Sequence, residues 1–552
     1  MLRRLCGGER HRAEYTAEIV YKENYERWQI LINRIDNYIG DLVRREDFNP
    51  DCFNLIDAGP GTGKTTFVNE RLHELFPEIP YRNIFMAESR SLTASMLDKS
   101  DSNFSMMHQN DIETKGRLMG LPDLNDDSVN SDIVVATYDK LVDMVAHNNG
   151  EGDILAGVDI IILDEVHCLY ADTFIGDIKA VSVWLKGLFS PDRIKRPLVI
   201  GLTATPDCFI RLNGVEQNLP IHRVLDRKLV KYQAQHLICG LMTDIPAMCK
   251  TRFRGKTLIM CEKLEDCYAL ARILGNAAVV CSSRNENITE EMIRIRRHIE
   301  EEATLPDTYL NEVTRRWEPL KYLIMTSTGR EGYNFVPKYA SGNLMVDDIQ
   351  NVVVCFTDPM SIVQFAGRPR YNVPNLMVAM NPFGQRGVNT NSFRWYQYIN
   401  RESYKEFVTS DDRRGNPWFR LMSPFIQERI DDIEVLPSVR LSPKVQQTEM
   451  RKMRSDSLVG ELIQEIGRYI SDESHEVRIY EADEKQIIDA AENVGLLDNG
   501  KYTFKRVLNI LKRNGFSVDC KDDRNWVNKK NQHKTYHIIR RNEDNEKGTQ
   551  AT

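Results

Sequence analysis

The sequence has no apolar run that approaches the roughly 18 residues needed to cross a bilayer. Its first residues, MLRRLCGGERHR, carry positive charge with no apolar stretch behind it, so we expect no secretory signal. The 11 cysteines lack the paired close spacing of a disulfide framework or a zinc site, and we expect them to be small core residues. Together these absences predict a soluble protein without a membrane partner. Its compartment would be cytoplasmic, or nuclear if the source is a eukaryote or its virus.

An overall excess of basic residues is also missing. The formal net charge is −7 and the pI about 6.0, which argues against a uniformly basic nucleic-acid coat, so any contact with a polyanion must be local. Hydrophobic residues make up 41% and charged residues 28%, which excludes wholesale disorder. A chain of 552 residues exceeds what one hydrophobic core usually supports, so we expect three or four domains.

Short β-branched runs alternate with helical patterns, which is typical of parallel sheets covered by helices. A first set of runs predicts an α/β domain over residues 48–228, and a second set predicts another over residues 229–400. The first set lies at 54–57, 132–137, 158–165 and 198–205, and the second at 256–262, 277–283, 322–327 and 351–356. We expect residues 1–47 to form an N-terminal segment with a helix.

Beyond these two domains the pattern changes. A charged stretch at 285–320 predicts a helical insertion with a solvated face. Helical segments separated by prolines predict a connector over residues 401–480. Residues 471–500 carry nine acidic and two basic side chains, whereas 501–541 carry twelve basic and three acidic, a swing from −7 to +9. Such asymmetry can mark a nucleic-acid surface.

The motif AGPGTGKTTF, at residues 58–67, follows an apolar strand and begins a helix. It is a P-loop: glycines let backbone N–H groups face the β-phosphate, and Lys64 bridges the β- and γ-phosphates. The Thr65 hydroxyl is a magnesium ligand in this motif. The pattern therefore predicts ATP and Mg²⁺ as cofactors, held by Gly59, Gly61, Thr62, Gly63, Lys64, Thr65 and Thr66.

A second strand ends in Asp164-Glu165-Val166-His167, about 100 residues further along. Two acids at the end of such a strand have different tasks: Asp164 is expected to hold the magnesium, and Glu165 to polarise the attacking water as general base. His167 is expected to link this site to the next strand.

With these two motifs the sequence resembles the superfamily 2 helicases of the DExH type over residues 25–375. The resemblance implies two tandem RecA-like domains and makes Thr203-Ala204-Thr205 the third motif, which couples hydrolysis to strand movement. In TSTGREGYNF, Thr326 would touch the nucleic-acid backbone, while Glu331, Gly332 and Asn334 would line the interdomain cleft. Asn334 stands where many relatives have Asp.

The segment QFAGRPRY at 364–371 resembles the sixth motif, whose arginines reach the γ-phosphate. Arg368 is in register, together with Gln364. The second arginine of the family usually follows three residues later, where this chain has Tyr371, so Arg370 is expected to substitute for it. An arginine at this place offsets transition-state charge.

Further residues match the family less closely. Ser89, Arg90 and Thr137 resemble its backbone-binding segments, with a plain surface role as the alternative. Gln29 stands where relatives hold an adenine-recognising glutamine. Residues 481–545 fit a basic winged helix, or else a plain basic helical cap, and 546–552 a disordered tail. In this domain Lys505, Arg506, Lys529 and Lys530 would meet phosphates, and Lys512, Arg513 and Lys534 are further candidates. Trp526 could stack on a base, with a buried position in the core as the alternative.

The sequence therefore predicts an ATP-dependent helicase or translocase, with DNA preferred over RNA and with replication, repair or restriction proteins as possible partners. Two alternatives stay open. One is a translocase that moves on duplex DNA without separating the strands. No nuclease or methyltransferase motif is evident in the chain, so either activity would have to come from a partner protein. The other is an ATP-switched origin-binding protein.

Overall fold

The computed structural model describes most of the chain from Tyr38 to Arg541, with gaps. The described residues are 38–80, 83–88, 104–106, 133–147, 155, 157–171, 178–193, 195–216, 219–225, 228–281, 288–311, 316–326, 333–338, 347–383, 392–467, 476–480, 508–509, 512, 516–523 and 534–541. They form two compact units. Unit 1 comprises residues 1–262 and 278–440, and unit 2 comprises residues 263–277 and 441–552.

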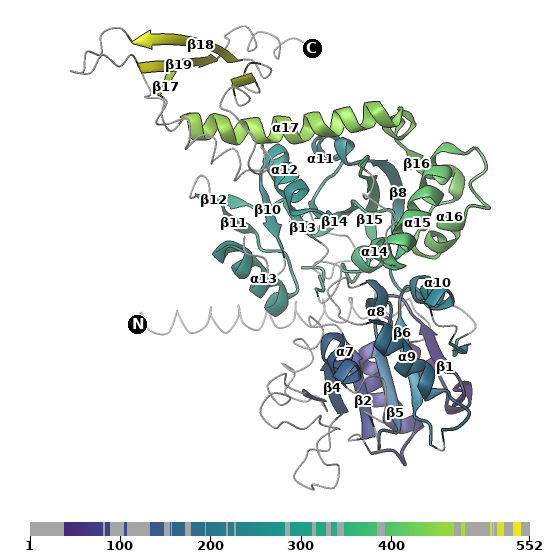
Figure 1. Ribbon diagram of the computed structural model, residues 1–552. Coiled ribbons are helices and arrows are strands. Elements are labelled where there is room, and N and C mark those ends of the chain that lie inside the picture. Colours follow the sequence, from purple (N-terminus) through teal and green to yellow (C-terminus); the bar gives the residue numbers. More distant parts are fainter. Residues whose placement is uncertain are drawn as a thin grey trace, which may run out of the picture. The chain divides into compact units, whose positions relative to one another are not determined.

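Unit 1 contains two parallel sheets with helices against them, each built from one part of the chain (Figure 1). The first sheet has the order β3-β4-β2-β5-β6-β1-β7, and every pair is parallel. Its central strands β1 and β5 are buried along their whole length, as expected when helices cover both faces. The strands are β1 (Phe53–Asp57), β2 (Ile84–Glu88), β3 (Phe104–Met106), β4 (Ile133–Thr137), β5 (Ile160–Asp164), β6 (Leu198–Thr203) and β7 (Ile221–Arg223).

Helices of this first domain follow the strands. The helix after the P-loop runs without a break through α3 (Lys64–Thr66), the π-type turn η2 (Phe67–Arg71) and α4 (Leu72–Leu75). The short helix α2 (Ile39–Leu42) lies against it, because Ile39 and Val43 share a hydrophobic core with Phe67. The others are η1 (Arg45–Asp47), α7 (Tyr138–His147), α8 (Cys168–Ala171), α9 (Ile178–Leu188) and α10 (Pro206–Glu216).

The second sheet has the order β10-β13-β9-β14-β15-β8-β16, and the pairs from β13 to β16 are parallel. It is the sheet of a second α/β domain. Its strands are β8 (Ala234–Leu241), β9 (Lys256–Met260), β10 (Ala277–Val280), β13 (Tyr322–Met325), β14 (Ile349–Val354), β15 (Val373–Met380) and β16 (Glu434–Val435).

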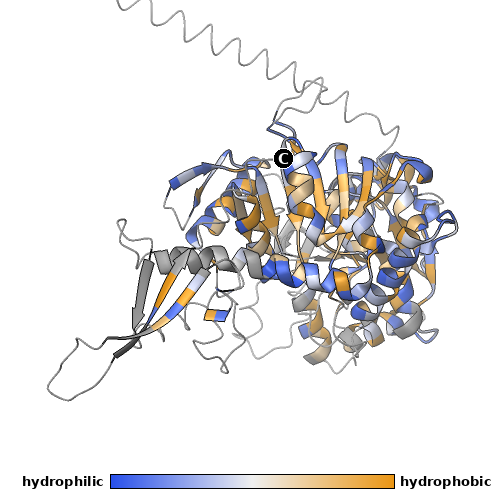
Figure 2. Cartoon of the chain, turned by 90° about the horizontal axis from the view of Figure 1, so that it is seen from above, coloured by the Kyte–Doolittle hydropathy of each residue, from blue (hydrophilic) through white to orange (hydrophobic). Residues whose placement is uncertain are grey.

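Helices of the second domain occur before, between and after these strands. Asp358 caps α14 (Pro359–Ala366) by accepting a hydrogen bond from the backbone N–H of Ser361 at 2.8 Å. The remaining elements are η4 (Met242–Asp244), α11 (Ile245–Thr251), α13 (Glu290–Glu302), α15 (Ser392–Thr409), α16 (Pro417–Met422), η6 (Ser423–Phe425), η7 (Ile430–Asp432) and η8 (Pro437–Arg440). Figure 2 shows hydrophobic residues concentrated on the strands, where the cores lie.

Unit 2 contains α12 (Leu264–Leu274), α17 (Pro443–Gly467) and a small antiparallel sheet of order β17-β19-β18. The two helices are joined by an ion pair in which Arg454 Nε lies 2.8 Å from Asp266 Oδ1 and Arg454 Nη2 lies 3.0 Å from Oδ2. The strands are β17 (Glu476–Tyr480), β18 (Phe516–Asp523) and β19 (Lys534–Arg541).

The two tandem RecA-like domains predicted from the sequence are confirmed by these sheets, and each predicted strand run coincides with a strand. The insertion at 285–320 contains α13, as expected, and also an antiparallel hairpin of β11 (Thr308–Asn311) and β12 (Arg316–Pro319). The connector at 401–480 is mainly helical but contributes β16 to the second sheet.

The winged helix stays a prediction. Within residues 481–545 the strands β18 and β19 pair antiparallel, whereas most of the range lies outside the described residues. Ten cysteines are described as free thiols, and eight of them are buried. Among the described helices, none is long and apolar enough to span a membrane.

Candidate ATP site at the junction of two domains

Three sequence motifs lie at the carboxyl ends of three neighbouring strands of the first sheet. The P-loop follows β1, the DEVH motif follows β5, and Thr203-Ala204-Thr205 ends β6, which lies between those two strands. Because the strands are parallel, their carboxyl ends meet at one edge, where ligands usually bind in such sheets. Residues some 40 to 140 positions apart in the chain therefore converge on one site.

The P-loop has the backbone that its glycines allow. Gly61 and Gly63 adopt φ angles of 76° and 86°, in the left-handed region that disfavours a side chain. Thr62 is buried and donates a hydrogen bond to Gly59 O at 2.7 Å, which closes the loop on itself. Thr65 is half-buried and Thr66 exposed in the first turn of the helix. The two φ angles and this hydrogen bond together define the shape of the loop.

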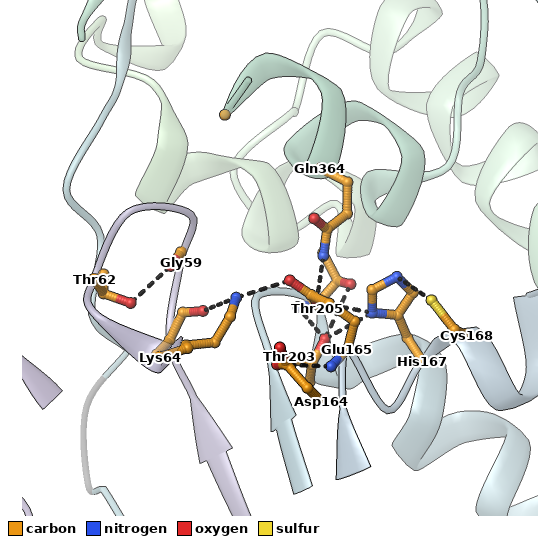
Figure 3. A network of polar contacts seen from close by, with 12 residues as sticks. Gly59, Thr62, Lys64, Asp164, Glu165, His167, Cys168, Thr203, Thr205 and Gln364 are labelled. Carbon is orange, nitrogen blue, oxygen red and sulfur yellow. Dashed lines mark hydrogen bonds and ion pairs between the residues drawn. The ribbon is translucent and has the colours of Figure 1, made fainter. Parts of the chain in front are cut away.

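Lys64 is held by a carboxylate of the second motif. Its Nζ atom lies 2.9 Å from Glu165 Oε1 and also donates a hydrogen bond to Ala58 O at 3.2 Å (Figure 3). Burial raises the pKa of Glu165, but the positive charge of Lys64, with contributions from His167 and Arg368, lowers the pKa below its ordinary value of 4.5. Glu165 is therefore a carboxylate, paired with the lysine that a phosphate would need.

Glu165 also has an unusual backbone, with φ at 47°. Left-handed backbone is costly for a residue with a side chain, and such strain often occurs at functional sites. Its backbone N–H donates to Asp164 Oδ1 at 2.9 Å, and this fixes the adjacent acids in different directions. Asp164 itself is buried, and its carbonyl oxygen accepts a hydrogen bond from the Tyr138 hydroxyl at 2.6 Å.

His167 connects the second and third motifs. Its Nδ1 lies 2.9 Å from Thr203 Oγ1 on β6 and 3.4 Å from Glu165 Oε2, and its Nε2 lies 3.6 Å from the Cys168 thiol. The Thr203 hydroxyl also accepts a hydrogen bond from Thr205 N at 3.0 Å. A shift of Glu165 can therefore reach β6 through one imidazole ring.

The second domain enters this network through Gln364 on α14. Gln364 is fully buried, and its Nε2 donates to Glu165 Oε2 at 2.9 Å (Figure 3). Its Oε1 accepts a hydrogen bond from Arg368 Nη2 at 3.0 Å. One amide group thus stands between the DEVH carboxylate and the expected arginine finger.

The two arginines of the sixth motif are held within the second domain. Arg368 is buried and donates to Gln364 O at 2.8 Å and to Tyr333 O at 3.3 Å. Arg370 hydrogen-bonds to Asn334 Oδ1, and burial together with Arg368 lowers the pKa of Arg370 to about 10. Tyr371 accepts a hydrogen bond from Ile349 N at 3.0 Å, so its hydroxyl is bound at the first residue of the central strand β14.

The P-loop and the sixth motif also touch directly. A Cβ atom added to Gly367 would lie 2.2 Å from Cγ of Pro60, which is closer than real Cβ contacts allow. Glycine at this position therefore lets the end of α14 approach the loop. No sequence signal predicts this contact, because Pro60 and Gly367 are some 300 positions apart.

Two tyrosines near the P-loop were also missed. A Cβ atom on Gly61 would lie 2.5 Å from a ring carbon of Tyr232, and one on Gly63 would lie 3.2 Å from a ring carbon of Tyr38. Lys231 joins the two tyrosines: its Nζ donates to Tyr38 OH at 2.9 Å and lies 5.5 Å from the Tyr232 ring centroid. No motif marked these residues.

The expected nucleic-acid contacts are less well placed. Thr137, at the end of β4, accepts a weak hydrogen bond from Lys140 N at 3.3 Å, as a helix cap would, and Thr326 follows β13. Neither contact tests the role predicted for these threonines. Gln29, Ser89, Arg90, Glu331, Gly332, Lys505, Arg506, Lys529 and Lys530 lie outside the described residues.

Residues 21–208 match the model of the family described as "Type III restriction enzyme, res subunit". This segment contains the P-loop, the DEVH motif and the third motif. The match supports the predicted resemblance to superfamily 2 helicases, which hydrolyse ATP, and it leaves the DExH subtype untested. No curated protein matches the sequence significantly.

Several solved structures are similar at low identity. S. cerevisiae Dbp5 bound to RNA and ADP BeF3 is 13% identical, with 74% of this chain and 91% of that chain covered and a TM-score of 0.39. Mss116p bound to ssRNA and AMP-PNP is 12% identical, with 80% and 83% covered and a TM-score of 0.42. The DUF1998 helicase MrfA bound to DNA is 12% identical, with 79% and 52% covered and a TM-score of 0.37. Similarities at this level carry no inference about the reaction or the nucleic acid.

Proposed function

We propose that this protein hydrolyses ATP at the junction of its two RecA-like domains and uses the reaction to move along nucleic acid. The observation that carries the proposal is the continuous polar chain from Lys64 through Glu165 to Gln364. It joins the P-loop, the DEVH motif and the sixth-motif helix of the other domain. Phosphate binding at Lys64 would therefore alter hydrogen bonds in both domains.

The residues present fit a magnesium nucleotide. Gly61 and Gly63 give the loop a curvature that leaves backbone N–H groups for phosphate, and Lys64 provides the cation. Thr65 and Asp164 would hold Mg²⁺ with a hydroxyl and a carboxylate oxygen, the donor type that this ion prefers. Bound Mg²⁺–ATP supplies the phosphoryl group that is transferred to water.

The chain's own residues would act around that group. When phosphate oxygens take over Lys64, Glu165 loses its cation and becomes free to accept a proton from water as general base. Gln364 would then be released as well, because it is hydrogen-bonded to the same carboxylate. Arg368, which is bonded to Gln364, could turn toward the phosphate and offset negative charge there.

Glu165→Gln tests the proposal, with Lys64→Ala as its companion. We expect Glu165→Gln to bind ATP but to lose at least about 100-fold in turnover, since general bases contribute factors of this order. Lys64→Ala should lose both hydrolysis and tight binding. Steady-state ATPase and binding of a fluorescent ATP analogue measure the two effects separately.

The matched control is Glu70→Gln, which removes an exposed carboxylate from the helix after the P-loop. It should retain wild-type turnover. Substantial ATPase in Glu165→Gln would remove Glu165 from the role of general base and with it the proposed reaction path.

DNA is the proposed track, for two reasons that both come from the sequence. The fifth and sixth motifs look less like those of the RNA-processing DEAH branch, and the basic tail resembles a DNA-binding winged helix. ATPase rates with single-stranded DNA, duplex DNA and RNA added in turn test this choice. Stimulation by RNA alone would contradict it.

A second candidate is a translocase that moves on duplex DNA without separating the strands. The match to the res subunit family of type III restriction enzymes favours it. Displacement of a triplex-forming strand without displacement of a paired strand would distinguish this candidate from a helicase. Sequence-selective DNA binding with negligible ATP turnover would instead indicate an ATP-switched binding protein.

A further inference from the structure

Helix α15 contributes side chains to the hydrophobic cores of both domains. By chain order it belongs to the second domain, and Tyr404, Phe407 and Val408 lie in that core. Phe393 and Tyr396, near its N-terminus, lie instead in a core cluster of the first domain. There α15 contacts α8 and α10. This single helix therefore spans the junction between the domains.

The docked end of α15 is packed tightly but is poorly satisfied in hydrogen bonds. Phe393 is 4% and Tyr396 0% exposed, and their rings are stacked with centroids 6.2 Å apart. Two buried polar atoms there have no hydrogen-bond partner among the described residues: Tyr396 OH and Asp207 Oδ2 on α10. Burial, with the nearby Cys208, Asp207 and Asp358, raises the pKa of Tyr396 well above its ordinary value.

The unpaired groups contribute unfavourably to the packing of α15 on α8 and α10. Burying an unpaired polar atom is unfavourable, and the atom regains hydrogen bonds when water reaches it. Separation of the domains would expose Phe393 and Tyr396, which opposes opening, but it would also hydrate the unpaired atoms, which favours opening. The two effects act in opposite directions at one surface.

The same end of α15 is linked to the ATP site. Gln397 Nε2 lies 3.5 Å from Asp358 Oδ2, and the other oxygen of Asp358 caps α14. Helix α14 carries Gln364, which donates to Glu165. Movement of α15 can thus change the position of α14 through Asp358.

We propose that α15 is a clamp helix: Phe393 and Tyr396 dock on α8 and α10 while the domains are together, and they leave that surface when the domains part. The docking part of this proposal depends only on how Phe393 and Tyr396 pack against α8 and α10, and not on any reaction. Its coupling to ATP hydrolysis rests on the proposed function.

Phe393→Ala tests the clamp through the distance between the domains. Fluorophores are attached to unnatural amino acids at Val183 on α9 and Ile293 on α13, which are 59% and 44% exposed, so the native cysteines stay unlabelled. Single-molecule energy transfer in the full chain without nucleotide then gives the ratio of open to closed molecules. We expect Phe393→Ala to raise this ratio about tenfold or more, because it removes a buried ring.

Trp395→Ala is the matched control, because Trp395 is the neighbouring aromatic residue on the exposed side of the same helix, at 38% exposure. The ratio of open to closed molecules in Trp395→Ala should equal that of the wild type. A folded Phe393→Ala with the wild-type ratio, or an equal rise in Trp395→Ala, overturns the clamp. Since no nucleotide is used, failure of the proposed ATPase would leave this result unaffected.

Tyr396→Phe provides a second test of the clamp if Phe393→Ala does not fold. It keeps the ring and removes the unpaired hydroxyl, so it should favour the docked state. In a urea concentration at which the wild type populates both states, the open-to-closed ratio should fall several-fold. An unchanged or higher ratio overturns the clamp.

Discussion

At the scale of single residues, the site is dominated by one carboxylate with several partners. Glu165 is shared by Lys64, His167 and Gln364, and it keeps a left-handed backbone at the same time. The P-loop and DEVH residues were predictable because motif spacing after a strand determines where they lie. Gln364 was predicted as part of the sixth motif, but its bond to Glu165 was not, since no sequence signal gives the partner of a side chain 199 residues away.

The lowered pKa of Glu165 predicts a pH dependence of stability. In the unfolded chain the carboxyl titrates near its ordinary value of 4.5, and in the folded protein it titrates lower. The ionised group therefore contributes stability above pH 4.5, and this contribution is lost as the pH falls through the folded-state pKa. The unfolding free energy of the wild type should exceed that of Glu165→Gln most at neutral pH, and the difference should narrow in acid.

Urea unfolding of the wild type and Glu165→Gln, followed between about pH 6 and pH 4, measures this difference. Glu70→Gln accounts for the loss of an exposed carboxylate from the same domain. A difference that stays constant or widens on acidification would show that Lys64 does not hold Glu165 ionised in the folded state.

At the scale of elements, parallel sheets explain both the success and the limits of prediction. Buried strands such as β5 and β14 were predictable because they contain runs of β-branched residues. The hairpin β11–β12 lacks such a run, because its residues are partly exposed and polar, and it was read as part of a helical insertion. Helix α15 was predicted as helix only in part, and its packing on two cores depends on tertiary contacts.

Gly367→Ala is expected to separate α14 from the P-loop. The backbone at Gly367 has φ at −84°, which alanine tolerates, so the added methyl group acts only through its overlap with Pro60. We expect ATPase to fall about tenfold or more while the thermal stability of the protein changes little, because misplacement of about 1 Å near a reacting group can have large effects.

Gly187→Ala provides the comparison. A Cβ atom at Gly187, on α9, meets nothing within 4 Å, so this variant should keep full ATPase and gain about 0.5–1 kcal/mol from better helix propensity. If Gly367→Ala retained wild-type ATPase, close approach of α14 to the loop would not be needed for hydrolysis.

At the scale of the whole molecule, the net charge of the C-terminal segment has the opposite sign to that of the rest of the chain. The chain is acidic overall, yet residues 501–541 carry a net charge of +9. Deletion of residues 480–552 should therefore weaken nucleic-acid binding more than basal ATPase. It should also make binding less sensitive to salt, because fewer counterions are released from the phosphates.

Fluorescence anisotropy with single-stranded DNA at several salt concentrations tests the role of the tail, and ATPase without nucleic acid serves as the internal control. Unchanged affinity at physiological salt would rule out the tail as a phosphate-binding surface. The winged-helix prediction would then lose its functional support.

The ion pair between Lys64 and Glu165 has a consequence for the proposed function: Glu165 would compete with phosphate for Lys64. An incoming nucleotide has to displace a tethered anion before the ammonium can receive a phosphate. In the proposed reaction the same displacement would free the Glu165 carboxylate to act as general base, so nucleotide binding and activation of the base would occur together. Until then the Glu165 carboxylate would stay paired with Lys64 and would not be available as a base.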